Sequence, residues 1–225
     1  MKDLPFDPYD FFGYIASGVV VVATAQLIFG FPKVFAAELK PFDIAVTILA
    51  VYIAGQMIAG PARAVFEDVV IRRVLDTPTK NLRNTKRPNV YGWLFPAYYS
   101  PLPEAIRTKL TAKIKALNLA SHEPEDIFLA IRFAPDVLAN ERLLARLDSF
   151  RDQYGFNRNV SFSLLLAGLC FLVAGHCRPA AQLTYYAITA LVTSLLLFYR
   201  YLKFFRQYSY ELLNTYACMN EKGTA

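Results

Sequence analysis

Four long runs of apolar and small residues contain no Asp, Glu, Lys or Arg. They cover residues 11–31, 44–62, 159–177 and 179–199. Each run is close to the about 20 residues that a helix needs to cross the hydrocarbon core of a bilayer. A surface helix of a water-soluble protein has a polar face, and these runs have none. The pattern predicts an all-α integral membrane protein built as a four-helix bundle.

The runs divide the chain of 225 residues into three parts. We expect an N-terminal transmembrane hairpin over 1–62, a basic helical segment over 63–158, and a C-terminal transmembrane hairpin over 159–225 with a helical tail. Apolar positions recur at helical spacing after residue 62, so the second helix should continue to about Leu75. Spans two, three and four are therefore expected to have cytoplasmic helical extensions.

The distribution of positive charge predicts an orientation. The net charge is +6, and most Lys and Arg residues lie in the segment 63–158. Cytoplasmic loops of membrane proteins carry an excess of Lys and Arg. This bias places the segment and the C-terminus in the cytoplasm. An even number of spans places the N-terminus there as well.

Two amide side chains, Gln26 and Gln56, lie inside the first two spans. An amide in hydrocarbon needs a partner, so each one either bonds a neighbouring helix or lines a pore or proton path. Interhelical bonding is the simpler interpretation. Gly18 and Gly55 allow two helix backbones to approach closely, and we expect spans one and two to pack through them. No span carries a charge near its centre, which argues against a proton-coupled transporter.

The segment after the second span is basic and aromatic. Its candidate surface for lipid or an anionic ligand consists of Arg83, Lys86, Arg87, Lys109, Lys113 and Lys115. Anionic headgroups attract such bases at about 1 kcal/mol each. An ordinary positive-inside loop with a small aromatic core also explains the composition. Nucleic acid or a nucleotide is a third partner, which we do not favour. An apolar stripe that includes Leu110 and Ile114 predicts a helix here, with Ser100 as its cap.

The stretch 136–158, before the third span, has mixed charge and is expected to be a solvated or partner-facing stalk. We expect Arg142, Arg146 and Arg151 to contact neighbouring copies or a cytosolic protein. The sequence has no phosphate-binding glycine loop and no nucleophile motif. His122 and His176 fall on opposite sides of the membrane in this topology. We expect no catalytic site, metal or cofactor.

The residues Asp10-Phe-Phe-Gly-Tyr lead into the first span, and Phe156-Asn-Arg-Asn-Val-Ser lead into the third. With the layout of spans, they resemble small bacterial multi-span membrane proteins of the kind found as membrane components of antiphage defence systems. The resemblance implies the bacterial inner membrane and an oligomeric effector or sensor acting with a soluble partner. It carries over no functional residue.

The expected function is therefore that of a non-enzymatic homo-oligomer in antiviral defence. Such a protein would perturb the membrane or signal through a cytosolic partner. The alternative is a membrane-anchored scaffold or sensor that recruits a cytosolic partner or an anionic ligand without conducting. An intramembrane enzyme or transporter is the third interpretation.

Overall fold

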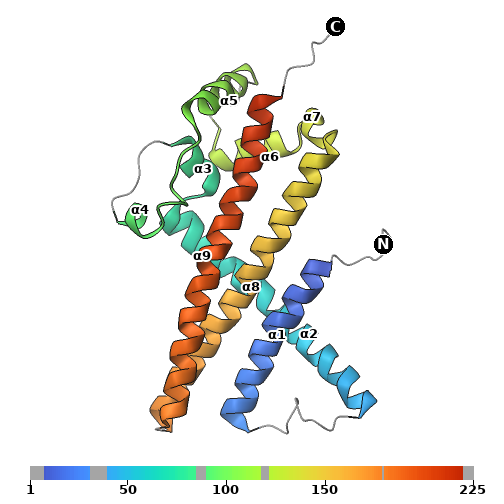
Figure 1. The fold of residues 1–225 in the computed structure, drawn as a ribbon, viewed down its shortest axis with the longest axis vertical. Helices are drawn as coiled ribbons and strands as arrows, with labels where there is room; N and C mark the ends of the chain where they lie inside the picture. The colour runs from blue at the N-terminus through green and yellow to red at the C-terminus, as the bar shows by residue number, and fades with distance from the viewer. Residues whose placement is uncertain (1–7, 31–39, 85–89, 118–121, 179, 220–225) are drawn as a thin grey trace. The chain divides into compact units, whose positions relative to one another are not determined.

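The computed structural model describes residues 8–30, 40–84, 90–117, 122–178 and 180–219. Every regular element in these ranges is a helix (Figure 1). Those long and apolar enough to cross a membrane are α1 (Pro8–Phe29), α2 (Pro41–Arg63), α8 (Glu141–Cys177) and α9 (Ala181–Cys218). The prediction of an all-α, multi-pass membrane fold is confirmed.

The chain forms two compact units, each with its own core. We call residues 1–69 and 152–201 the membrane unit, and residues 70–151 and 202–225 the helical domain. The sequence interpretation divided the chain at 62 and 158 instead. The difference arises because the helices do not end where their apolar runs end. The shorter helices of the helical domain are α3 (Pro78–Arg83), α4 (Tyr91–Leu94), α5 (Glu104–Ala116), α6 (Pro124–Arg132) and α7 (Pro135–Leu138).

The second span continues without a break into a π-helix, η1 (Ala64–Leu75), and reaches Leu75 as expected. A π-helix pairs each N–H with a carbonyl five residues back and is rare in long runs. Pro61 lies inside α2, shortly before the change of helix type. Proline cannot donate a backbone hydrogen bond, and its ring crowds the preceding turn. Both effects disfavour an unbroken α-helical pattern at this point.

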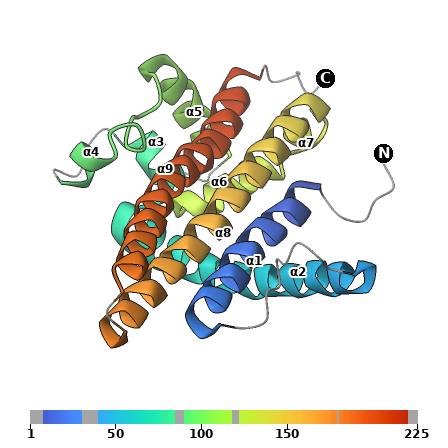
Figure 2. The same cartoon turned by 60° about the horizontal axis from the view of Figure 1, so that its bottom comes forward.

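Two glycines bring α1 and α2 into direct backbone contact. A Cβ atom added to Gly18 would lie 1.8 Å from the carbonyl oxygen of Val51. A Cβ added to Gly55 would lie 1.8 Å from the carbonyl oxygen of Tyr14. Figure 2 shows α2 crossing α1, with the first turns of α2 lying away from α8 and α9. The crossing therefore depends on the missing side chains of these two glycines.

In the membrane unit, α8 and α9 are joined by a reciprocal pair of buried hydrogen bonds. Ser161 Oγ donates to the carbonyl oxygen of Ser194 at 2.8 Å, and Ser194 Oγ donates to the carbonyl oxygen of Ser161 at 2.7 Å. Further along the same two helices, Ala167 and Ala187 belong to a small apolar core against which α1 packs through Val20. Small residues and hydroxyls are the usual means of joining helices in lipid.

The core of the helical domain is formed by buried aliphatic residues from several helices. It includes Leu110 and Ile114 of α5, Ile127 and Ile131 of α6, Leu143 and Leu147 of α8, and Leu212 and Leu213 of α9. The predicted apolar stripe of α5 thus faces a core. The helix begins at Glu104 with Pro103 as its N-cap, so the expected cap at Ser100 is wrong. Ser100 and Leu102 each precede a proline, and a residue in that position is disfavoured from helical backbone angles.

The contact between α1 and α2 at Gly18 and Gly55 predicts that one added methyl group lowers stability at some positions and not at others. Gly55→Ala should destabilise the protein by about 1–3 kcal/mol, the usual range for an overpacked contact. Gly60→Ala is the matched control on the same helix, because a Cβ at Gly60 meets nothing within 4 Å. Thermal unfolding in detergent, followed by circular dichroism, measures both. Equal melting temperatures for the two variants would contradict the crossing.

Candidate anion-binding site

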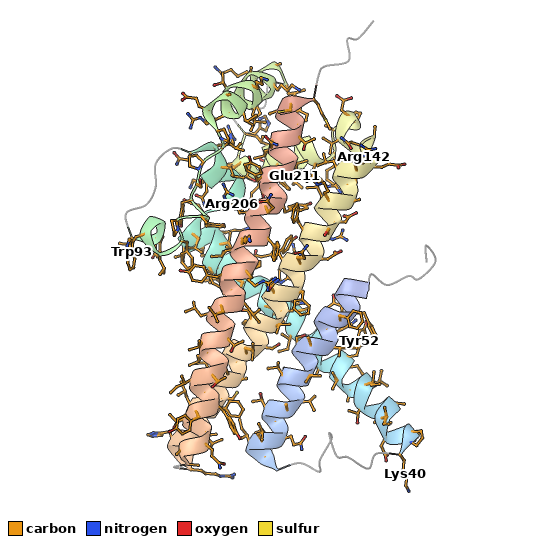
Figure 3. The ribbon with its side chains drawn as sticks, viewed as in Figure 1. Lys40, Tyr52, Trp93, Arg142, Arg206 and Glu211 are labelled. Carbon is orange, nitrogen blue, oxygen red and sulfur yellow. The ribbon has the colours of Figure 1, made fainter. Side chains whose placement is uncertain are left out.

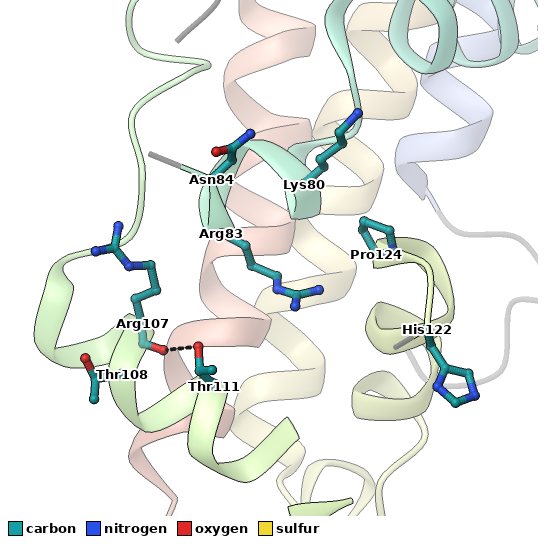
Figure 4. Close-up of a pocket in the computed structure, with 8 residues that line it drawn as sticks. All are labelled: Lys80, Arg83, Asn84, Arg107, Thr108, Thr111, His122 and Pro124. Carbon is teal, nitrogen blue, oxygen red and sulfur yellow. Dashed lines mark hydrogen bonds between the residues drawn. The ribbon is translucent and has the colours of Figure 1, made fainter. Parts of the chain in front are cut away.

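The helical domain contains a pocket of about 630 Å³ with a polar lining (Figure 4). Its lining residues are Lys80, Arg83, Asn84, Arg107, Thr108, Thr111, His122 and Pro124. Figure 4 shows the guanidinium of Arg83 between α5 and the start of α6. The lining contains four side chains that can be cationic and no carboxylate. This composition suits an anion.

Local hydrogen bonds fix the position of α3, which carries Arg83. The chain turns at Asp76, which has a φ of 60°, in the left-handed region that asparagine and aspartate tolerate best. Tyr98 Oη donates to the carbonyl oxygen of Asp76 at 2.8 Å, and Tyr99 Oη donates to that of Leu75 at 2.9 Å. Burial and the nearby charge of Asp76 raise the pKa of Tyr99 to about 12, so this hydroxyl keeps its proton. Asn81 Nδ2 also donates to the carbonyl oxygen of Leu75.

The wall formed by α5 is held by its own helix and by one bond to α3. The backbone N–H of Leu102, just before α5, donates to the carbonyl oxygen of Leu82 at 2.9 Å. Thr108 and Thr111 donate their hydroxyl hydrogens to the carbonyl oxygens one turn earlier. These hydroxyls can therefore accept but not donate without losing a bond. The hydrogen-bond donors available to a ligand are therefore Arg83, Arg107, Lys80, Asn84 and His122.

The charges around the pocket are balanced except at Arg83. Lys80 Nζ lies 2.6 Å from a carboxylate oxygen of Asp76, and Arg107 lies 3.7 Å from Glu104. Among the residues that the structure describes, Arg83 has no carboxylate partner. Burial lowers the pKa of Arg83, because loss of water penalises its charged form. Its guanidinium still carries its charge at neutral pH. A bound anion would offset this loss of hydration.

The lining also limits the kind of ligand. Apart from Pro124 and the imidazole of His122, its side chains are charged, amide or hydroxyl groups. An acyl chain would therefore find little apolar surface here. A guanidinium presents a planar fork of donors that matches phosphate oxygens. In the described part of the chain, no three His, Cys, Asp or Glu side chains come together to hold a metal.

The basic residues singled out from the sequence are in different environments. Arg83 lines the pocket, whereas Lys109 and Lys115 are exposed on α5 outside its lining. Lys113 donates to the carbonyl oxygens of Tyr216 and Met219 and so caps the C-terminus of α9. Lys86 and Arg87 lie outside the described residues. Lys113 therefore has a structural role in addition to its charge.

The favoured interpretation was that Gln26 and Gln56 bond neighbouring helices, and the described residues show no such bond. Gln56 is exposed and donates to the hydroxyl of Tyr52 on its own helix at 2.8 Å. The Oε1 atom of Gln26 is buried and has no hydrogen-bond partner among the described residues. A separate cavity of about 560 Å³ between α1, α2 and α8 includes neither side chain in its lining. Its hydroxyls, Thr24 and Ser163, donate to carbonyls of their own helices.

A partly buried ion pair in the membrane unit was not found from the sequence. Arg158 Nη1 of α8 lies 2.5 Å from Glu67 Oε1 of η1, and the two side chains are only 15% and 19% exposed. Arg158 also donates to Asn159, and Glu67 accepts a second contact from Arg63. The pair lies 91 residues apart in the chain, so only the fold reveals it. It holds η1 against α8.

The stalk arginines make contacts inside the helical domain. Arg146 Nη1 of α8 lies 2.5 Å from Glu211 Oε1 of α9, and Glu211 is buried. Arg151 pairs with Asp148 on the same helix at 3.3 Å. Arg142 is exposed at the end of α8 (Figure 3). Of the three, Arg142 is the one whose replacement leaves these ion pairs intact.

The pocket thus brings together Lys80, Arg83, Arg107 and His122, which belong to three separate segments of the chain. Sequence reasoning selected Arg83 alone of these four. Lys80 lies one helical turn before Arg83, which is the one local signal that links two of them. No protein-family model, curated protein or solved structure matches this chain.

The pair Arg146–Glu211 predicts an outcome for charge reversal. Arg146→Glu should lower the stability of the protein by about 1 kcal/mol or more, because it places two carboxylates together. Arg142→Glu should leave stability unchanged. The double variant R146E/E211R should recover most of the loss, since it restores opposite charges. Melting temperatures of the three purified variants test this, and a failure of the double variant to recover would count against the pair.

Proposed function

We propose that this protein is a multi-pass membrane receptor whose helical domain binds a phosphate-bearing ligand. The observation that carries the proposal is the position of Arg83. Its charged fork lies in a cationic pocket and has no carboxylate partner in the described chain. This is the scaffold-or-sensor interpretation of the sequence, with the anionic partner assigned to a defined pocket. We propose binding alone, without a chemical reaction.

The expected ligand is polar throughout. Lys80, Arg107 and His122 surround Arg83 with further donors, so the pocket suits more than one phosphate oxygen. Because the lining consists mostly of charged and polar side chains, the phosphates should be attached to a small hydrophilic group. Both a soluble phosphate compound and a lipid headgroup offer this chemistry. Binding measured in membranes of different charge separates the two sources.

We propose that the helical domain and both termini face the cytoplasm of a bacterial inner membrane. The excess of Lys and Arg in the segment 63–158 supports this orientation. A reporter fused after Tyr208 should be active in the cytoplasm. Periplasmic activity of that fusion would overturn the orientation while leaving the pocket itself untouched.

Loss of the Arg83 charge should weaken binding of a phosphate probe. We expect pyrophosphate to bind the full-length protein in zwitterionic nanodiscs, and Arg83→Gln to weaken binding about tenfold or more. A hydrogen bond to a charged group contributes about 1.5–3 kcal/mol, and about 1.4 kcal/mol corresponds to a factor of ten. Isothermal titration calorimetry gives both dissociation constants. The affinity should also fall as salt is added.

The matched control is Arg142→Gln, which removes an exposed arginine of the same domain. It should bind pyrophosphate as the unchanged protein does. Nanodiscs that contain anionic lipid provide the second arm, because headgroups that occupy the pocket would compete with pyrophosphate. Absence of pyrophosphate binding in zwitterionic nanodiscs would refute the proposal. So would equal weakening by the two arginine substitutions.

A further inference from the structure

The short helix α4 presents a cluster of apolar side chains to the outside of the helical domain. Trp93 is 84% exposed, Val90 is 72% exposed and Leu94 is 45% exposed. Figure 3 shows Trp93 at the tip of α4, directed away from the rest of its domain. Single exposed apolar residues are common, but neighbouring large ones mark interaction surfaces.

We propose that α4 is an interfacial lipid anchor, in which Trp93, Val90 and Leu94 lie among the headgroups of the bilayer. Trp and Tyr are enriched at membrane–water interfaces, where the ring sits at the headgroup level. The indole suits this position because it has an apolar body and one polar N–H group. Tyr91, also exposed, adds a second aromatic side chain of this kind.

The exposure of these side chains is built into the local structure. The backbone N–H of Phe95 donates to the carbonyl oxygen of Tyr91 at 2.8 Å and closes the turn. Directly after the turn, Phe95, Tyr98 and Tyr99 are buried in the domain. Tyr98 and Tyr99 are further held by their bonds to the chain before α3. These buried aromatic residues hold α4 in a position that leaves Trp93 outside the core of the domain.

The connections between the two units favour a lipid surface as the partner of α4. The chain passes between the membrane unit and the helical domain three times, at 69–70, 151–152 and 201–202. The bilayer around the spans is therefore held at a high effective concentration near the helical domain. A soluble protein or a second copy would have to be recruited from solution or by diffusion. The inference is independent of the proposed ligand of the pocket.

Contact between α4 and lipid can be measured by fluorescence, because Trp93 is the one tryptophan of the chain. In nanodiscs whose scaffold protein lacks tryptophan, and with excitation at a wavelength that tyrosine does not absorb, the intrinsic fluorescence therefore reports on α4 alone. Lipids brominated near the headgroup end of the acyl chain quench an indole that touches them. We expect brominated nanodiscs to remove more than half of the emission seen in unbrominated ones. Iodide added to the water should quench weakly.

A matched control moves the indole to another exposed aromatic position. Phe133, after α6, is 64% exposed in the same domain. The variant W93F/F133W should be quenched by iodide and unaffected by brominated lipid. If Trp93 shows that same response, α4 lies in water and the inference is wrong. If neither quencher reaches Trp93, protein covers α4, and the inference is wrong in that case as well.

Discussion

The pairing of α8 with α9 is the interaction on which the rest of the structure depends, because these two helices supply residues to both cores. In the membrane unit the pair is closed by the reciprocal bonds of Ser161 and Ser194. In the helical domain the two helices are joined by the ion pair of Arg146 and Glu211, and both contribute leucines to the core. Hydroxyls join the helices where lipid excludes water, and an ion pair joins them where both helices carry charged residues. The chemistry of each contact follows its surroundings.

The candidate pocket is a consequence of that helical core. Leu82 and Leu102 are buried with the leucines of α8 and α9, which brings α3 close to the start of α5. On one side of Leu82, Asn81 is buried and bonds the carbonyl oxygen of Leu75. Arg83 follows Leu82 directly and is left half-buried between α5 and the start of α6. A partly dehydrated cation of this kind costs free energy unless an anion meets it. The proposed ligand binding would in this way be linked to folding through the adjacent residues Leu82 and Arg83.

The sequence predicted the helices well and the site poorly, for physical reasons. Length and apolarity alone identify a span, so the four spans and the extension to Leu75 could be predicted. The close approach at Gly18 and Gly55 was also a reasonable inference, since small residues have few other uses in lipid. Contacts between distant segments leave no such trace. Nothing local indicates that Arg158 meets Glu67, or that His122 lies near Arg83. Oligomeric state, a soluble partner and a role in antiviral defence stay predictions.

Hydrogen–deuterium exchange of the full-length protein in zwitterionic nanodiscs tests the central claim most directly. It measures protection of backbone amides with and without pyrophosphate, and it requires no substitution. The account predicts slower exchange in peptides that cover 78–84 and 104–111, which carry the walls of the pocket, and no change in the peptides of α8 within the membrane unit. Unchanged exchange at the pocket walls, or equal protection throughout the chain, would contradict it.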